Sequence, residues 1–343
     1  MRVSLVLTHQ CNLACSYCYT GDKFNRSMPV ELGWKALKMA FHGPREETVG
    51  VSFFGGEPML QFKTMSRLTR LATRLAERQG RRLELSLTTN ATILTKKQLD
   101  FLRHYGFWVA LSIDGMGADH DRHRPFVNGR SSSELVWRNL EAATEALERL
   151  HVLMVLNPET IGGVPAALEQ MYRLGVSRVS LLPNMEAAWD EAARETARRV
   201  YHDMARVVFL SMATPEPYHV SPFADQHPRA PRTSHCSFGV KDVAVSPRGK
   251  LYPCSRLVGT DTRVDVQVGT VDTGPLLDRV QAVTSCSAEK MSSCGTSGPC
   301  ACVSLMPGDI QQQLSVHRFF AELIGDSVEA ARQYLEELQM VAA

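Results

Sequence analysis

Short runs rich in Val, Leu, Ile, Phe and Thr alternate with longer helical segments over the first 212 residues. In the helical segments apolar residues recur every three or four positions, as at Met65, Leu68 and Leu71. Thr95 and Gln98 form a capping box at the start of another helix. Repeated βα units dictate a mostly parallel α/β sheet, open or closed into a barrel, with ligands at the carboxyl ends of the strands. We expect strands at residues 2–8, 48–54, 83–89, 107–113, 151–156 and 177–182.

The regular alternation stops near Thr214, where five prolines fall between residues 215 and 231. Proline is excluded from helix interiors and central strands, so this stretch indicates a boundary. We therefore expect a barrel domain over residues 1–213, a proline-rich linker over 214–235 and an extension over 236–343.

The extension begins with a pattern typical of a β-hairpin, residues 243–252, which turns at Ser246-Pro247-Arg248-Gly249. A stretch rich in Gly, Ser and Cys, residues 285–302, has little to bury, and we expect it to need a metal for order. Residues 311–340 predict a terminal helix with a break at Gly325.

Charge and hydropathy exclude several classes of protein. The chain has 38 basic and 36 acidic side chains, a formal net charge of +2 and no block of like charges. These values argue against a nucleic-acid binder and against a polybasic membrane anchor. The chain has no apolar run long enough to span a membrane, and its N-terminus lacks the features of a signal peptide. We expect a cytoplasmic protein.

The nine cysteines fall into two groups, because residues 19–235 contain none. Structural disulfides are rare in a reducing compartment, so clustered cysteines favour metal ligands or catalytic groups. Two sites are expected, one formed by Cys11, Cys15 and Cys18, the other drawn from Cys236, Cys254, Cys286, Cys294, Cys300 and Cys302.

The first group forms a C-x3-C-x2-C run directly after the first expected strand. Three thiolates on a short loop can hold three corners of a 4Fe-4S cluster and leave one iron open for a substrate. A structural zinc site completed by His9 is the alternative, but its ligands usually come in paired knuckles. The spacing therefore favours iron and sulfur.

The triplet, with Tyr17 before its last cysteine, resembles the signature of the radical S-adenosylmethionine enzymes. The resemblance covers residues 1 to about 212 and implies a partial (β/α)6 TIM-like barrel. Phe54-Gly55-Gly56-Glu57-Pro58 is similar to the family's GGEP motif, which implies that this strand end, with Glu57, receives the amino group of S-adenosylmethionine.

Further strand ends carry polar residues similar to those that line the cofactor site in this family. They include Asn90, Ser112 and Asp114, followed by Arg124 in a His120-Asp121-x-x-Arg124 segment whose arginine is implied to reach the cofactor carboxylate. Tyr17 is implied to pack near the adenine, with a core tyrosine as the alternative. The resemblance implies that a reduced cluster cleaves S-adenosylmethionine to a 5'-deoxyadenosyl radical, which abstracts hydrogen from a substrate.

The second group of cysteines resembles part of a SPASM or twitch extension. Cys236-x12-Gly249-x4-Cys254 is similar to its opening, and Cys294-x5-Cys300 matches one of its intervals. Six cysteines cannot ligate two clusters that need eight, so the resemblance implies one auxiliary cluster, with a second incomplete or absent. A zinc site is the alternative. Cys286 and His317 are candidate replacements for missing ligands.

The resemblance implies an enzyme that modifies a peptide or protein by crosslinking, thioether formation, epimerisation or oxidation. The alternatives are a twitch-type small-molecule oxidoreductase and a non-catalytic metal-binding protein on a degenerate barrel. Implied partners are a flavodoxin or ferredoxin type electron donor and, because the first strand begins at residue 2, a separate peptide-recognition protein or direct docking of the peptide. No catalytic residue is assigned: Asp121, His120 and Cys286 are conceivable proton or radical partners, but surface or ligand roles are favoured.

Overall fold

The computed structural model describes residues 1–43, 47–212, 214–215, 217–226, 237–292, 302–306 and 308–342. Within these residues one sheet has the strand order β11-β10-β9-β8-β1-β2-β3-β4-β5-β6-β7. Its central strands are parallel and adjacent in chain order, and the sheet does not close. The six predicted strands are confirmed as β1 (Arg2–Val6), β2 (Val49–Phe54), β3 (Leu83–Thr89), β4 (Trp108–Ser112), β5 (Leu150–Leu156) and β6 (Arg178–Pro183).

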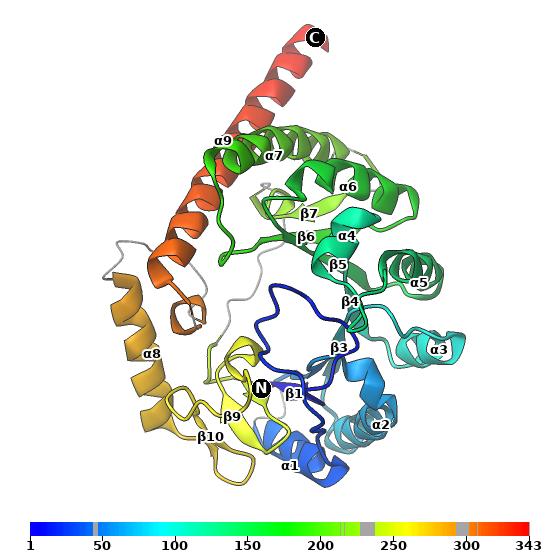
Figure 1. Ribbon diagram of the computed structural model, residues 1–343. Helices are drawn as coiled ribbons and strands as arrows, with labels where there is room; N and C mark the ends of the chain where they lie inside the picture. Colours follow the sequence, from blue (N-terminus) through cyan, green and yellow to red (C-terminus); the bar gives the residue numbers. More distant parts are fainter. Residues whose placement is uncertain are drawn as a thin grey trace.

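The helices between these strands lie on the outside of the curved sheet (Figure 1). The capping box before α3 is present, because Thr95 Oγ1 accepts from the Gln98 amide and Gln98 Oε1 accepts from the Thr95 amide. The short α4 (Ala118–His123) follows the carboxyl end of β4. The longer outer helices are α1 (Val30–Ala40), α2 (Phe62–Gln79), α3 (Lys96–His104), α5 (Ser133–Ala146), α6 (Val164–Arg173) and α7 (Glu191–Ser211).

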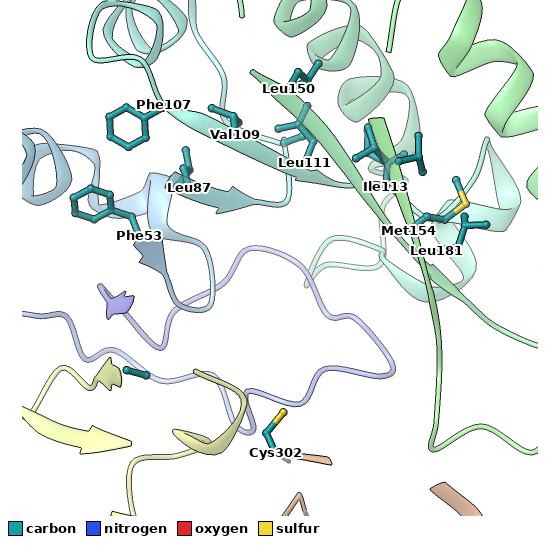
Figure 2. Close-up of a cluster of buried hydrophobic side chains, with 14 of the residues drawn as sticks. Phe53, Leu87, Phe107, Val109, Leu111, Ile113, Leu150, Met154, Leu181 and Cys302 are labelled. Atoms are coloured by element: carbon teal, nitrogen blue, oxygen red, sulfur yellow. The ribbon is translucent and has the colours of Figure 1, made fainter. Parts of the chain in front are cut away.

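Along the strands, buried residues alternate with half-buried ones, so one face of the sheet is more buried than the other. On β3, Leu85, Leu87 and Thr89 are buried, whereas the intervening Ser86 and Thr88 are half-buried. The buried positions of β3 are mostly apolar, and the polar side chains between them remain partly accessible. Figure 2 shows part of the apolar core, with Cys302 apart from Phe53, Leu87, Phe107, Val109, Leu111 and Ile113.

Residues beyond the barrel extend the same sheet at both edges. The predicted hairpin is confirmed as β8 (Asp242–Val245) and β9 (Lys250–Tyr252), and β8 pairs in parallel with β1. Gly249 turns the hairpin with a φ of +80°. At the other edge β7 (His219–Ser221) pairs with β6, so the expected linker over 214–235 contains an edge strand. The hairpin continues to the short strands β10 (Gly269–Thr270) and β11 (Gly274–Pro275). The division into two domains stays a prediction.

The last two helices correct one expectation and cover part of the segment of another. Residues 285–292 form the end of α8 (Leu277–Ser292), whose Val280 and Val283 are buried. Residues 293–301 of the stretch expected to need a metal lie outside the described residues, so that expectation stays a prediction. The expected break at Gly325 is wrong, because α9 (Ile310–Ala342) continues through it. Phe320 and Val328 are buried on either side, and this burial outweighs the cost of about 1 kcal/mol for glycine in a helix.

The long α9 packs along α7, and its C-terminal end projects beyond the rest of the fold (Figure 1). Phe320 of α9 contacts Tyr201 of α7, with ring centroids 5.3 Å apart. Among the described residues, no helix is both long and apolar enough to cross a membrane.

Candidate functional site

A cavity of 260 Å³ opens at the carboxyl ends of the parallel strands. It lies where the loop after β1 meets the ends of β2 to β6, as the βα alternation predicts. The structure brings together most of the predicted site residues along its wall: Cys11, Cys15, Tyr17, Cys18, Gly55, Gly56, Asn90, Ser112 and Arg124.

The cysteine loop is held by the segment that follows α4. The amide of Ala14 donates to the carbonyl of Pro125 at 2.9 Å, and the amide of Ser16 donates to the carbonyl of His123 at 3.0 Å. Leu13, directly before Ala14, is fully buried. The loop and Arg124 are therefore positioned by the same contacts, although they are far apart in sequence.

The three thiols differ in their surroundings. Burial raises the pKa of Cys11 and raises that of Cys15 to about 11. Burial also acts to raise the pKa of Cys18, but hydrogen bonds from Lys23 and Thr20 outweigh it and the pKa is lowered. Lys23 Nζ lies 3.0 Å from Cys18 Sγ. The thiolate is the form that ligates metal, and Lys23 favours it at Cys18.

The arrangement fits a cluster better than a single ion. No three His, Cys, Asp or Glu side chains of the described residues gather as ligands of one metal ion. Tetrahedral zinc requires such convergence, whereas each cysteine of a 4Fe-4S cluster ligates its own iron. His9, the ligand of the zinc alternative, is buried with its ring stacked on Phe24 and does not line the cavity.

The two glycines of the GGEP motif are required by the chain's own backbone. A Cβ on Gly56 would lie 2.2 Å from the carbonyl oxygen of Gln10, and one on Gly55 would lie 2.5 Å from that of Thr8. Gly55 also has a φ of +147°. These glycines therefore make room for the start of the cysteine loop. Both also line the cavity, and their place at the cofactor stays a prediction.

Glu57 is completely buried and does not line the cavity. Its Oε1 accepts from the Met59 amide at 2.8 Å and from Thr89 Oγ1 at 2.7 Å, and its Oε2 accepts from the Asn90 amide at 2.8 Å. A carboxylate has about four acceptor positions, so three are occupied. Glu57 joins the ends of β2 and β3, and its contact with the cofactor ammonium stays a prediction.

Tyr17, Asp114 and Arg124 form one buried cluster at the cavity. The Tyr17 hydroxyl donates to Asp114 and accepts from Arg124 Nη1 at 2.5 Å, and Arg124 Nη1 lies 3.8 Å from Asp114 Oδ2. Asp114 also accepts from the Val155 amide. Buried Arg124 Nε has no hydrogen-bond partner among the described residues. An unpaired guanidinium donor at a cavity wall fits the carboxylate of S-adenosylmethionine.

His120 and Asp121 support this cluster from outside the cavity. His120 Nδ1 accepts from the Asp114 amide at 3.2 Å, and burial lowers the His120 pKa to about 3. Asp121 Oδ1 accepts from the amides of Ser132 and Ser133 at the start of α5. Neither lines the cavity, and both accept hydrogen bonds from backbone amides of neighbouring segments.

The second cysteine group is described only in part, because Cys236, Cys294 and Cys300 lie outside the described residues. Cys254 is half-buried, Cys286 is exposed on α8 and Cys302 is buried. Ser287 and Ser304 hydroxyls lie 2.9 Å apart, which brings the segments of Cys286 and Cys302 together. The auxiliary ligand set, including His317, stays a prediction.

Sequence reasoning missed many residues of the cavity wall, among them Tyr19, Asn184, Glu186 and Arg256. The Tyr19 ring stacks on Phe54, and the Arg256 guanidinium lies 5.5 Å from the centre of the Tyr19 ring. Asn184 and Glu186 directly follow β6, so the rule that strand ends carry the site could have found them.

Comparisons with known proteins agree with this geometry. The sequence model of the radical SAM superfamily matches residues 5–171. The PqqA peptide cyclase of Xanthomonas campestris pv. campestris is 30% identical over 286 residues, which cover 74% of this chain and 67% of that protein. The chain belongs to the radical SAM superfamily. The sequence resemblance is therefore confirmed, and the predicted 4Fe-4S cluster and S-adenosylmethionine are the cofactors of this superfamily.

Two other relatives are similar to part of this chain. The serine-type anaerobic sulfatase-maturating enzyme of Klebsiella aerogenes is 24% identical over 276 residues, covering 74% of this chain and 66% of that protein. An uncharacterised protein of Methanocaldococcus jannaschii is 28% identical over 129 residues, covering 38% of this chain and 43% of that protein. The matched part of the chain thus spans between about two fifths and two thirds of the length of these relatives.

Solved structures confirm the fold. The structure of native anSMEcpe with bound AdoMet has a TM-score of 0.74 at 16% identity and covers 96% of this chain and 99% of that chain. Streptococcus suis SuiB bound to its precursor peptide SuiA has a TM-score of 0.58 at 15% identity, covering 81% of this chain and 63% of that chain. The partial barrel therefore has the same α/β architecture as these solved structures.

Proposed function

We propose that this protein is a radical SAM enzyme that reductively cleaves S-adenosylmethionine and abstracts hydrogen from a side chain of a ribosomal peptide or protein. The observation that carries this proposal is the meeting of Cys11, Cys15 and Cys18 with Arg124 in one cavity. The bound cluster and S-adenosylmethionine supply the electron and the 5'-deoxyadenosyl radical.

The chain's own residues bind and orient the cluster and the cofactor. The three thiols hold the cluster and leave one iron for the cofactor. Arg124, fixed by Tyr17 and Asp114, offers its unpaired Nε to the cofactor carboxylate. Asn90 Nδ2 lies 3.8 Å from Cys11 Sγ and donates to Asn12, so it holds the start of the cysteine loop against the end of β3.

A peptide substrate is supported by the relatives, whose printed names are a peptide cyclase and a sulfatase-maturating enzyme. The proposed modification is crosslinking, thioether formation, epimerisation or oxidation. The proposal includes a cytoplasmic location, a flavodoxin or ferredoxin type electron donor, and either a separate recognition protein or direct docking of the peptide.

Anaerobic reconstitution followed by iron counting and an assay for 5'-deoxyadenosine tests the proposal. Cubane clusters contain four irons, so about eight irons per chain support an auxiliary cluster and about four indicate the first cluster alone. Cys15→Ala should abolish cleavage of S-adenosylmethionine and remove about four irons, whereas Cys286→Ala, at an exposed thiol, should retain the first cluster. A reconstituted protein that never cleaves S-adenosylmethionine under reductant would leave only the non-catalytic metal-binding alternative.

A second assay separates peptide from small-molecule substrates. Peptides encoded by short reading frames next to the gene would be incubated with the reconstituted enzyme and examined by mass spectrometry. A peptide whose mass changes only with S-adenosylmethionine and reductant supports a maturase. Cleavage of S-adenosylmethionine without any modified peptide favours the twitch-type oxidoreductase.

A further inference from the structure

The cavity wall opposite the cysteine loop is largely apolar. Leu153 and Val155 of β5 and Leu182 of β6 line it, and Met306 closes it from the C-terminal part of the chain. Glu186, in the loop between β6 and α7, is the one acidic side chain among the described lining residues. A carboxylate on an otherwise apolar wall favours a positively charged group at this side of the cavity.

The loop that carries Glu186 is held in place by α9. The Glu186 amide donates to Asn184 Oδ1 at 3.1 Å, and Gln312 Nε2 donates to the carbonyls of Glu186 and Ala187 at 3.0 and 3.1 Å. Trp189 Nε1 donates to the Asn184 carbonyl, and the buried Trp189 ring packs edge-on against Phe320. The side chain of Glu186 therefore projects from a fixed backbone.

The Glu186 carboxylate is not neutralised by its neighbours. Among the described residues it makes no ion pair, and its side chain is exposed to solvent. Of the two arginines in the wall, Arg124 contacts Tyr17 and Asp114, and Arg256 lies over the Tyr19 ring. The carboxylate thus retains its capacity to attract a cation that enters the cavity.

We propose that Glu186 is a specificity-determining residue that selects peptides carrying a lysine or arginine beside the residue held in the cavity. The inference rests on the proposed function, because it concerns which peptide that same cavity accepts. The apolar wall receives the aliphatic part of the substrate, and Glu186 pairs with the neighbouring basic side chain. The cation of S-adenosylmethionine is expected elsewhere, near the cysteine loop and the ends of β2 to β4.

Two pools of fluorescein-labelled decapeptides test this inference on the reconstituted enzyme with S-adenosylmethionine bound. The pools are random except for one central position, lysine in one pool and glutamate in the other. Exposed ion pairs contribute up to about 1 kcal/mol, so the lysine pool should bind about two to five times more tightly. Glu186→Gln should remove this preference, and Glu186→Lys should invert it. The matched control is Glu322→Gln, at an exposed position on α9, which should retain it.

Iron content and thermal unfolding of each variant show whether it is folded. No preference in the wild-type enzyme, no measurable binding of either pool, or the same preference in Glu186→Lys as in the wild type would each overturn the inference. None of these results bears on the cleavage of S-adenosylmethionine by the wild-type enzyme, which tests the proposed function separately. The preference should also fall as salt rises from 50 to 500 mM, because salt screens exposed charges.

Discussion

Arg124 Nη1 donates to the Tyr17 hydroxyl at 2.5 Å, which joins two residues that lie 107 positions apart in the chain. The same hydroxyl donates to buried Asp114. The cysteine loop, the end of β4 and the segment after α4 therefore meet at one hydroxyl group. Removing this oxygen would leave an arginine and a carboxylate without their shared partner.

Tyr17→Phe is expected to lower the free energy of unfolding by about 1–3 kcal/mol, because it removes hydrogen bonds to two charged groups. Affinity for S-adenosylmethionine should fall, because Arg124 loses a contact that orients it. Chemical unfolding and equilibrium dialysis measure the two effects. Tyr172→Phe, at an exposed ring on α6, is the control and should change neither. Unchanged stability and affinity in Tyr17→Phe would show that the cluster does not hold Arg124.

Gly56→Ala is expected to displace the cysteine loop, because its Cβ would lie 2.2 Å from the carbonyl oxygen of Gln10. The variant should bind less iron than the wild type after identical reconstitution. Iron content, measured together with the absorbance of the reconstituted cluster, checks this. Gly43→Ala serves as the control, because its nearest heavy atom is 4.0 Å away at Glu47. Equal iron content in Gly56→Ala would mean that the loop accommodates the methyl group.

Gly325→Ala is expected to stabilise the protein by about 1 kcal/mol, since alanine is the better helix former. Gly325 lies inside the continuous α9, and no heavy atom lies within 4 Å of its ideal Cβ. Chemical unfolding of the two proteins under one set of conditions measures the difference. Destabilisation would indicate that α9 bends at this position in solution.

Stability should fall as the pH drops below the ordinary His pKa of 6.5, because burial lowers the pKa of His120 to about 3. Between these values the unfolded chain binds a proton that folded His120 does not, so acid favours unfolding. From pH 6.5 to 5 the loss from His120 is about 1–2 kcal/mol. His120→Gln should show a smaller loss over this range than the wild type in urea unfolding. Parallel pH profiles for the two proteins would contradict a neutral, buried His120.

Local sequence patterns predicted the central strands and a site at the cysteine triplet. Both depend on residues within one short segment, whose periodicity or spacing can be read from the sequence. The same reasoning failed where packing decided the outcome. Gly325 indicated a break, but burial of Phe320 and Val328 keeps α9 continuous.

Within the site, sequence reasoning found residues that follow strands in recognisable motifs and missed those that depend on distant segments. Glu57 and Asp114 are buried behind the wall, where they accept hydrogen bonds from neighbouring strand ends, and their contact with the cofactor stays a prediction. Glu186 was missed although it follows β6, and the contact of its backbone with Gln312 of α9 could not be read from the local sequence.

The sequence by itself determined a parallel βα sheet, a thiol triplet at its mouth and membership of the radical SAM superfamily, because each is carried by residues close together in the chain. Only the tertiary structure decided which polar groups face the cavity and which support it. That choice depends on contacts between segments a hundred or more residues apart, such as Arg124 with Tyr17 and Gln312 with the loop of Glu186. Burial and hydrogen bonding across those distances leave no local pattern in the chain.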